Sequence, residues 1–406
     1  MANTKKLNIL CVSRFFKGSD FLTSVHDEGH QVYLLTSTKL KNDPWPFNII
    51  TEAFYMDEDS KGEWNMEHAI EGLAHTIRRL KFDAFIALDD FDVENVAYLR
   101  EHFRMPGMGE TTARYFRDKL AMRMKAQEEG ISVPAFTALF HDEDIEHYAN
   151  TVPAPWLIKP RSQASATGIK KIHDKAQLWE VLNSLGGERH HYLLEKFAPG
   201  AVFHVDSLIF DGKVLFAKAS QYVDTPFEVA HGGGIFRSAT IGDTTADAKA
   251  LLKMNNDIMK AFGMVYSASH TEFIKCHEDG KYYFLETSAR VGGAHLAEMV
   301  EYATGINLWK EWAKIEIASK LGKKYTAPKP EKYHAGILVS LSRYQKPDLA
   351  PFNHKNVCWK MDKDYHVGFI LRDTEIKQVH QLLNDYTEIV KSEYHASLPA
   401  PDRPTN

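Results

Sequence analysis

The pattern of apolar residues changes near residue 192, and this change limits the folds that the chain can adopt. Before it, short apolar runs alternate with helical segments, and Leu7–Val12 and Gln31–Thr36 are expected to be strands on either side of a helix at Asp20–Glu28. Short apolar strands that alternate with helices are typical of a parallel α/β unit. Beyond residue 192, β-rich apolar runs predominate, and Asp211-Gly212 between two of them is a strong hairpin signal. The sequence therefore predicts α/β and α+β parts within one chain.

Composition excludes several classes of protein. The 49 basic and 54 acidic residues give a net charge of -5, which provides no general attraction to nucleic acid or to an anionic membrane. The three cysteines (Cys11, Cys276 and Cys358) show no CxxC spacing, so neither a disulfide framework nor a Cys-rich zinc site is expected. No apolar stretch approaches the roughly 18 residues of a membrane span, and the first apolar run is too short for a signal peptide. We expect a soluble, cytoplasmic protein with no nucleic-acid or membrane partner.

The most informative spacing lies in a predicted hairpin made of SASHTEFIKC and KYYFLETSAR. Alternate residues of a strand share a face, so Glu286, Ser288 and Arg290 lie together on the second strand. His270 and Glu272 share a face of the first strand in the same way. If the turn pairs the strands, Glu272 and Glu286 converge, and two carboxylates with a neutral oxygen suit Mg²⁺. Arg290, one step further, could grip a phosphate or a carboxylate. A solvated polar face of a hairpin would show the same spacing.

A second candidate site follows the predicted strand WLIK, which ends at Lys159. Small residues from Ser162 to Gly168 come next, and they would let backbone N–H groups approach an anion closely while the lysine adds a point charge. The G-x-x-x-x-G-K-[ST] motif is absent, and an ordinary surface loop would look the same. A third feature, Glu195-Lys-Phe197 at another strand end, could offer backbone groups and a carboxylate to an adenine edge, or be a strand end alone.

Taken in chain order, these features resemble the ATP-grasp superfamily. The ordered set is Asp118-Lys119, Lys159 with its small-residue loop, Glu195-Lys-Phe, Glu272, and Glu286-x-Ser-x-Arg290. The segments KPRSQASATGI and ETSARVGGAH look most like the carboxylate–amine ligase branch, which includes L-amino-acid ligases. The resemblance covers about residues 1–395 and is most specific over 118–296.

The resemblance implies an ATP-grasp fold with an N-terminal parallel α/β (pre-ATP-grasp) domain, a small mobile lobe and a β-rich lobe with the metal site. ATP would lie between the two lobes. The expected segments are 1–105 for the N-terminal domain, 106–190 for the small lobe with the phosphate loop, 191–327 for the large lobe, 328–395 for a C-terminal α/β subdomain, and 396–406 for a disordered tail.

The resemblance also implies which residues bind the nucleotide. Two lysines would meet its phosphates, a loop of small residues would cover them, and a strand end would meet the base. The expected residues are Lys119 and Lys159 for the phosphates, Ser165, Ala166, Thr167 and Gly168 for the covering loop, Glu195 and the backbone at Phe197 for adenine, and His204 near the ribose or phosphates.

Metal and acyl-group contacts are implied in the same way. Glu272 and Glu286 would hold two Mg²⁺ ions, or Mn²⁺ in their place, with Ser288 nearby. Arg290 would stabilise the acyl phosphate and the tetrahedral intermediate, and Lys159 is expected to join it as a catalytic cation. From the sequence itself, His295 after Gly292-Gly293 could contact a substrate. His231 and Arg237 lie in a predicted loop that could cover a substrate or equally be a flexible surface loop.

The implied reaction is an ATP-dependent carbon–nitrogen ligation. A carboxylate attacks the γ-phosphate of ATP to form an acyl phosphate, and an amine then displaces phosphate through a tetrahedral oxyanion. ADP and phosphate are the other products. The expected partners are a small-molecule carboxylate and a small-molecule amine, one of them an amino acid, and a homodimer stays open.

Two departures from the family pattern keep other interpretations open. Relatives commonly have Asn where Ser288 stands, and many have an acidic ribose-binding residue shortly after the glycine that matches Gly200, where this chain has Ala201–Phe203. A nucleotide-binding regulatory protein with weakened catalysis would retain the fold, and a carboxylase-like enzyme could use it for another acceptor. Phosphate release that depends on added substrate would separate the ligase from the regulatory protein.

Overall fold

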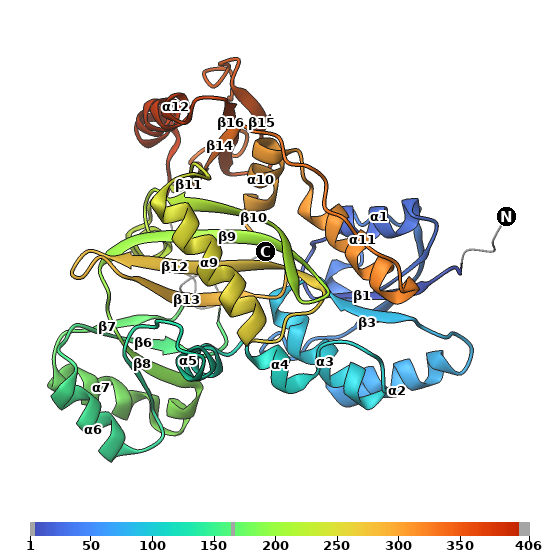
Figure 1. Cartoon of the computed structure of the whole chain (residues 1–406), viewed down its shortest axis with the longest axis horizontal. Helices are drawn as coiled ribbons and strands as arrows, with labels where there is room; N and C mark the ends of the chain where they lie inside the picture. The colour runs from blue at the N-terminus through green and yellow to red at the C-terminus, as the bar shows by residue number, and fades with distance from the viewer. Residues whose placement is uncertain (1–4, 164–166, 398–406) are drawn as a thin grey trace.

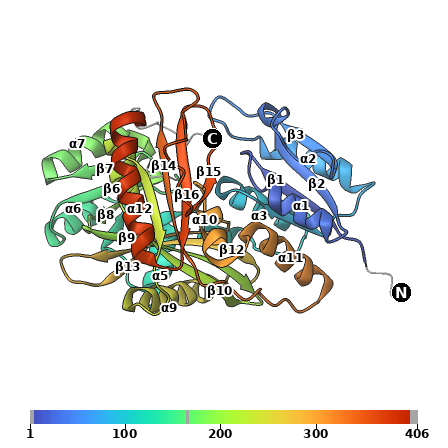
Figure 2. The same cartoon turned by 90° about the horizontal axis from the view of Figure 1, so that it is seen from above.

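The computed structural model of the protein describes residues 5–163 and 167–397. Their strands form three sheets with helices packed around them (Figures 1 and 2). The predicted loop residues Ser165 and Ala166 lie outside the described residues, as does the predicted tail from residue 398 on. None of the helices in these two ranges has the length and apolar character that crossing a membrane requires.

The N-terminal sheet is parallel throughout, as the sequence predicts. In spatial order its strands are β3 (Ile50–Met56), β2 (Gln31–Ser37), β1 (Asn8–Ser13) and β4 (Ala84–Ala87), and the neighbouring helices are α1 (Ser19–Asp27), α2 (Met66–Ile77) and α3 (Val93–His102). Leu10 and Val12 of β1 belong to one apolar core, whereas Ile9 and Cys11 belong to another. Because both faces of the strand are buried, its residues are apolar almost without interruption.

The sequence from Thr111 to Glu129 predicts one long helix that ends at Gly130. This prediction is wrong, since the chain forms α4 (Glu110–Arg114) and then α5 (Lys119–Glu128). Asp118 separates them. Its side chain accepts hydrogen bonds from the backbone N–H groups of the first turn of α5, at 2.9 and 3.5 Å, which is the geometry of a helix N-cap. The break matters for the site, because it places Lys119 at the start of α5.

The small sheet itself contains one of the predicted lysines, Lys159, near the end of one strand, and the small-residue loop follows that strand (Figure 1). Its strands, in spatial order, are β5 (Phe136–Ala138), β8 (Tyr192–Lys196), β6 (Trp156–Pro160) and β7 (Lys170–Ile172), and it packs with α6 (Asp142–Thr151) and α7 (Lys175–Leu185). The apolar side chains of these elements form a core of their own.

The large sheet has eight antiparallel strands. In spatial order they are β13 (Tyr282–Ser288), β12 (Ser267–Cys276), β9 (Gly200–Phe210), β10 (Lys213–Tyr222), β11 (Phe236–Thr240), β14 (His334–Leu341), β16 (His366–Asp373) and β15 (Val357–Lys360). Its helices are α8 (Pro226–Gly232), α9 (Ala246–Ala261), α10 (Leu296–Thr304), α11 (Leu308–Leu321) and α12 (Ile376–Ile389). The predicted hairpin at Asp211-Gly212 joins β9 to β10, and both turn residues have positive φ.

The N-terminal sheet and the large sheet share an apolar core. Helix α11 packs on α1, and the rings of Phe21 and Trp312 meet edge to face with centroids 5.0 Å apart. Leu208 of β9 and Ala268 of β12 belong to the same cluster of buried residues as Ile9 of β1. These two parts of the molecule are therefore held at a fixed distance by packing.

Replacing Gly200 by Ala is expected to destabilise the protein. Gly200 begins β9 opposite Cys276, and a Cβ there would lie 2.2 Å from the carbonyl oxygen of Lys275. Overpacking of this kind typically costs about 1–3 kcal/mol. Thermal unfolding should show a lower midpoint for Gly200→Ala than for Gly187→Ala, where no atom lies within 4 Å of the added Cβ. Equal midpoints for the two variants would contradict this.

Candidate active site

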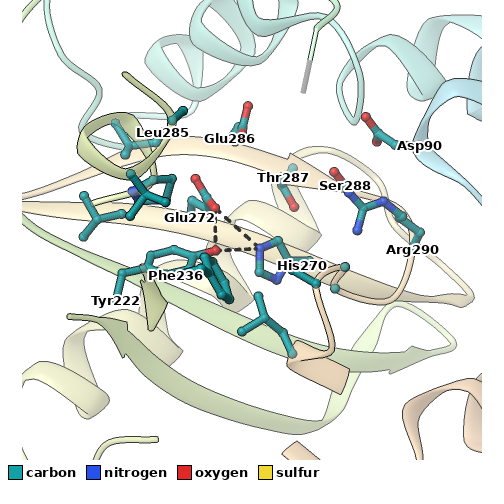
Figure 3. Close-up of a pocket in the computed structure, with 18 of the residues that line it drawn as sticks. Asp90, Tyr222, Phe236, His270, Glu272, Leu285, Glu286, Thr287, Ser288 and Arg290 are labelled. Atoms are coloured by element: carbon teal, nitrogen blue, oxygen red, sulfur yellow. Dashed lines mark hydrogen bonds and ion pairs between the residues drawn. The ribbon is translucent and has the colours of Figure 1, made fainter. Parts of the chain in front are cut away.

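A cleft of about 1600 Å³ lies where the three sheets meet. The N-terminal sheet contributes the segment Phe15–Asp20 and the acidic loop after β4, the small sheet contributes Lys159 and Glu195, and the large sheet contributes the ends of β12 and β13. Residues that are far apart in the sequence thus line one continuous space, part of which Figure 3 shows.

Glu272 and Glu286 lie directly opposite each other in the β12–β13 ladder, and His270 lies opposite Ser288. The strand pairing predicted from the sequence is therefore confirmed, and both carboxylates line the cleft (Figure 3). The register shifts immediately afterwards, because Phe273 pairs with Phe284 and leaves Leu285 as the extra residue of a β-bulge. The guanidinium of Arg123 donates a hydrogen bond to the carbonyl oxygen of Leu285.

Lys119 reaches across to the large sheet. Its Nζ lies 2.6 Å from Glu286 Oε2 and donates to the carbonyl oxygen of Gln163 at 2.6 Å. Burial would raise the pKa of Glu286, but the positive charge of Lys119, assisted by Lys159 and Arg123, holds that pKa below its ordinary value. Glu286 is therefore a carboxylate at neutral pH, the form that can ligate a metal ion.

Glu195 is the centre of a buried ion cluster. It is 1% exposed, and its two oxygens accept hydrogen bonds from Arg123 Nε at 2.7 Å and from Lys159 Nζ at 2.5 Å. Both cations keep the pKa of Glu195 low although burial opposes this. The predicted contact between its side chain and adenine conflicts with this geometry, since each carboxylate oxygen already has a cationic partner. The Glu195 side chain instead holds Lys159 at the cleft wall.

The backbone at Phe197 lines the cleft, as predicted, but only part of it is free to bind a base. Its N–H donates to the carbonyl oxygen of Pro155 at 3.0 Å. Thr167 and Gly168, the described part of the predicted covering loop, lie in a turn before β7, and Thr167 lines the cleft. Gly168 has φ +71° and sits against Pro160, a conformation that favours glycine.

His204 is placed differently from the prediction. It is completely buried in β9 and does not line the cleft, so as it stands it cannot contact a ribose or phosphate there. Its ring bonds to Ser238 Oγ at 2.8 Å and to Asp206 at 2.7 Å. Asp206 also holds His270 at 2.8 Å, and His270 lies 3.6 Å from Glu272. The sequence shows the i, i+2 spacing of His204 and Asp206 but not that both lie at the base of the metal-site face.

This buried network sets the charge around Glu272. Burial would lower the pKa of His270, but Asp206 and Glu272 outweigh it and raise that pKa to about 9. Tyr222 donates to Glu272 Oε1 at 2.8 Å, as the dashed lines of Figure 3 mark. The side chains of His204, Asp206 and His270 are close enough together to hold a metal ion, but both rings are engaged with the Asp206 carboxylate, so we interpret them as a hydrogen-bonded network.

Arg290 and His295 line the cleft beyond the paired carboxylates. Arg290 Nη1 donates to the carbonyl oxygen of Val291 at 2.7 Å, whereas its Nε is buried and has no partner among the described residues. His295 Nδ1 lies 3.0 Å from Glu298. Gly292, which also lines the cleft, lies close to the buried network, since a Cβ there would lie 2.7 Å from Asp206 Oδ1.

The segment around His231 and Arg237 is not the predicted loop, although residues 225–230, directly before His231, line the cleft. His231 lies in α8, which begins with a capping box between Thr225 and Glu228, and Arg237 lies in β11. Arg237 does not line the cleft. It pairs with Asp224 at 2.6 Å and donates to Thr387 of α12 at 3.2 Å, on the opposite face of the sheet from Phe236, which does line the cleft.

Sequence reasoning missed the contribution of the N-terminal sheet. Lys17, Asp89 and Asp90 line the cleft from loops that follow β1 and β4. Lys17 pairs with Asp89, and Arg117 donates to Asp90 Oδ2 at 3.0 Å. A usable signal existed, because ligands of parallel α/β sheets usually bind beyond the carboxyl ends of the strands. Asp89 and Asp90, which follow β4 closely, occupy that position.

Replacing Glu195 by Gln is expected to destabilise the protein strongly. The variant leaves two buried cations with a neutral partner, and breaking a buried pair from one side typically costs about 3–5 kcal/mol. Because the folded state lowers the pKa of Glu195, its stabilisation is present above the ordinary value of 4.5 and is lost as pH falls through the lower folded-state value. Urea unfolding should show a stability difference from wild type that is constant above about pH 5 and shrinks in acid. Equal stability at neutral pH would contradict the cluster's role.

Comparison with known proteins gives a consistent picture. No protein-family model matches the chain. It is 27% identical over 243 residues to an L-arginine-specific L-amino acid ligase of Bacillus subtilis, a match that covers 58% of each protein. It is 24% identical over 206 residues to a D-alanine–D-alanine ligase of Neisseria gonorrhoeae, which covers 49% of this chain and 66% of the relative. The chain thus spans less than two thirds of the length of either relative.

The fold has a clear counterpart among solved structures. The crystal structure of an L-amino acid ligase from Bacillus licheniformis superposes with a TM-score of 0.76 at 17% identity, over 97% of this chain and 99% of that one. The resemblance and the fold class predicted from the sequence are both confirmed. The chain has the ATP-grasp fold and is similar to the carboxylate–amine ligases of that superfamily.

Proposed function

We propose that the protein is an ATP-dependent ligase that joins a carboxylate to an amine through an acyl phosphate and releases ADP and phosphate. The observation that carries the proposal is the single cleft in which Lys119, the opposed carboxylates of Glu272 and Glu286, and Arg290 follow one another. Similarity to two ligases whose names specify amino acids supports an amino acid as one substrate.

The proposed cofactors are ATP and Mg²⁺, with two ions, or Mn²⁺ in their place. Glu272 and Glu286 offer oxygen ligands from adjacent strands, and the hydroxyl of Ser288 follows on the same face, a donor set that hard cations prefer. The ions would neutralise the triphosphate and hold it in line with the attacking carboxylate. Lys119 and Lys159 would bind phosphate oxygens, and Glu195 would keep Lys159 aimed at them.

Arg290 would act on the acyl group. It stands beyond the paired carboxylates, its Nη1 is anchored by a backbone carbonyl, and its buried Nε has no partner among the described residues. A fixed donor aimed at a developing oxyanion is worth roughly 10²–10³ in rate. Arg290 would therefore stabilise the acyl phosphate and the tetrahedral intermediate more than it stabilises bound ATP.

The expected boundary between 106–190 and 191–327 needs one correction, because β8 (Tyr192–Lys196) belongs to the small sheet. We assign 106–190 together with β8 to the lobe that covers the nucleotide, and the rest of 191–327 to the lobe that holds the metal. The N-terminal domain at 1–105 and the segment 328–395 would complete the substrate end. All three cysteines are free thiols, which supports the expected cytoplasmic location.

Glu286→Gln is expected to abolish turnover while the fold remains. The amide keeps the shape of the side chain and can still accept from Lys119, but it lacks the charge that a metal ion requires. Phosphate release with an active substrate pair should fall to background, with a thermal midpoint close to that of wild type. The matched control is Glu278→Gln, an exposed glutamate in the turn of the same hairpin. Wild-type activity of Glu286→Gln at ordinary Mg²⁺ concentration would remove the metal assignment.

Hydroxylamine should trap the proposed intermediate. With ATP, Mg²⁺ and the carboxylate substrate, the protein is expected to form a hydroxamate and ADP, because hydroxylamine attacks the acyl phosphate in place of the amine. Isotope-labelled oxygen of the carboxylate should appear in phosphate. Arg290→Ala should lose most hydroxamate formation and still bind ATP in calorimetry. Formation of AMP and pyrophosphate would move the protein to an adenylating mechanism.

A further inference from the structure

The acidic loop after β4 contains three aspartates, and two of them are fully paired. Asp89 accepts from Lys17 and from a backbone N–H, at 3.1 Å in the second case. Asp92 accepts from Arg14 with both oxygens, at 3.0 Å from Nε and 2.8 Å from the backbone N–H. These two carboxylates therefore serve the local structure of the loop.

Asp90 differs from its neighbours. It is 5% exposed and lines the cleft, and its Oδ2 accepts from Arg117 Nη1 at 3.0 Å. Its Oδ1 is buried and has no hydrogen-bond partner among the described residues. An ionised oxygen buried in this way costs free energy unless a donor reaches it, so the atom points to a ligand.

The surroundings of Asp90 fix its direction. Arg117 is itself buried, its guanidinium lies over the ring of Phe91 with 4.3 Å to the centroid, and it also donates to the carbonyl oxygen of Ser162. These contacts hold one carboxylate oxygen and leave the other buried without a donor among the described residues, in a residue that lines the cleft. In Figure 3 the carboxylate of Asp90 projects into the pocket from the wall opposite the strand end with Ser288 and Arg290.

The charges around Asp90 select the kind of ligand. A phosphate or a carboxylate offers mainly acceptor oxygens and cannot satisfy the unpaired acceptor of Asp90, whereas an ammonium group has only donors and matches it. The loop lies within electrostatic reach of Arg290: although burial opposes it, Lys17 and then Arg290 lower the pKa of Asp89. A nitrogen held at Asp90 would therefore lie near the residue proposed to hold the acyl oxyanion.

We propose that Asp90 binds the amino group of the amine substrate and holds it for attack on the acyl phosphate. The inference rests on the proposed ligase function and deepens it, because it names the part of the cleft that receives the second substrate and the class of that substrate, a primary amine that is protonated at neutral pH. The bound ammonium group gives one proton to solvent water, and the same carboxylate oxygen still accepts an N–H from the neutral amine, so the nitrogen keeps its position. Its lone pair then forms the C–N bond while the bond from the acyl carbon to the phosphate oxygen breaks, and the second proton that the nitrogen loses also passes to water. Asp90 is assigned binding and positioning, with no proton transfer.

The test compares wild type with Asp90→Asn, using single L-amino acids as amines in a substrate pair that supports phosphate release. Asn retains an oxygen for Arg117 but replaces the unpaired acceptor by an N–H₂ donor. Loss of a charge-assisted hydrogen bond should raise the KM for the amine about tenfold or more. The KM for ATP should not change. Hydroxylamine is small and largely uncharged at neutral pH, so hydroxamate formation at saturating hydroxylamine should stay within about twofold of wild type.

Asp57→Asn, at an exposed aspartate outside the cleft, controls for the lost charge. An unchanged KM for the amine in Asp90→Asn overturns the proposal. So does a joint loss of hydroxamate formation and of affinity for the carboxylate substrate, which would assign Asp90 to the activated substrate. If Asp90→Asn melts early, Asp90→Glu keeps the charge for Arg117 but displaces the free oxygen, and the amine KM should again rise. A wild-type protein that forms no hydroxamate and releases no phosphate with any pair refutes the ligase function itself, and the assignment of Asp90 falls with it.

Discussion

The register between β12 and β13 is the constraint on which the candidate active site depends. Side chains alternate along a strand, so a slip of one residue would turn Glu272 or Glu286 to the opposite face and separate the pair. The bulge at Leu285 lies directly beside this pair, and Arg123 takes up the Leu285 carbonyl oxygen. The same arginine holds Glu195, which holds Lys159. One interruption of the ladder thus connects the paired carboxylates of the large sheet with Lys159 of the small sheet.

The charges in the cleft come as pairs contributed by different elements. Lys119 of α5 faces Glu286 of β13, and Lys17 of the N-terminal loop faces Asp89. A metal ion at Glu286 and a phosphate at Lys119 would replace the Lys119–Glu286 ion pair by two new ones. A metal ion bound alone would leave Lys119 without its partner, and a phosphate bound alone would leave Glu286 without its partner. The two ligands are therefore expected to bind more tightly together than separately. The aspartates of the acidic loop after β4 are paired with cations in the same way, but Asp90 retains one oxygen without a protein partner among the described residues.

Local patterns predicted more of this protein than long-range contacts did. The βαβ opening, the Asp211-Gly212 turn and the pairing of Glu272 with Glu286 follow from alternation and turn residues within short segments, and all three are present. The break at Asp118 was missed because Asp is tolerated in a helix, and only its hydrogen bonds to the following turn mark it as a cap.

Other errors came from tertiary structure. His204 and Arg237 have residue types that suit a binding site, but neither lines the cleft. His204 is buried in a hydrogen-bonded network, and Arg237 lies on the opposite face of the sheet. Glu195 was predicted at the correct place with the wrong partner, since Arg123 gives no signal of its own in the sequence. These contacts depend on which helices and strands pack together. The alternation of side chains along a strand, on which the sequence prediction relied, carries no information about that packing.

The distribution of apolar cores has a consequence for exchanging parts between proteins of this fold. The small sheet packs on a core made only of its own residues, between positions 139 and 194. The N-terminal sheet and the large sheet instead share a core, where Phe21 meets Trp312. A chimera that imports the small sheet of a relative would therefore disturb few buried apolar contacts, provided that it keeps the ion pair of Glu195 with Arg123. A chimera that imports the N-terminal domain alone would divide the core that this domain shares with the large sheet. The N-terminal domain and the large sheet are therefore expected to be transferable only together.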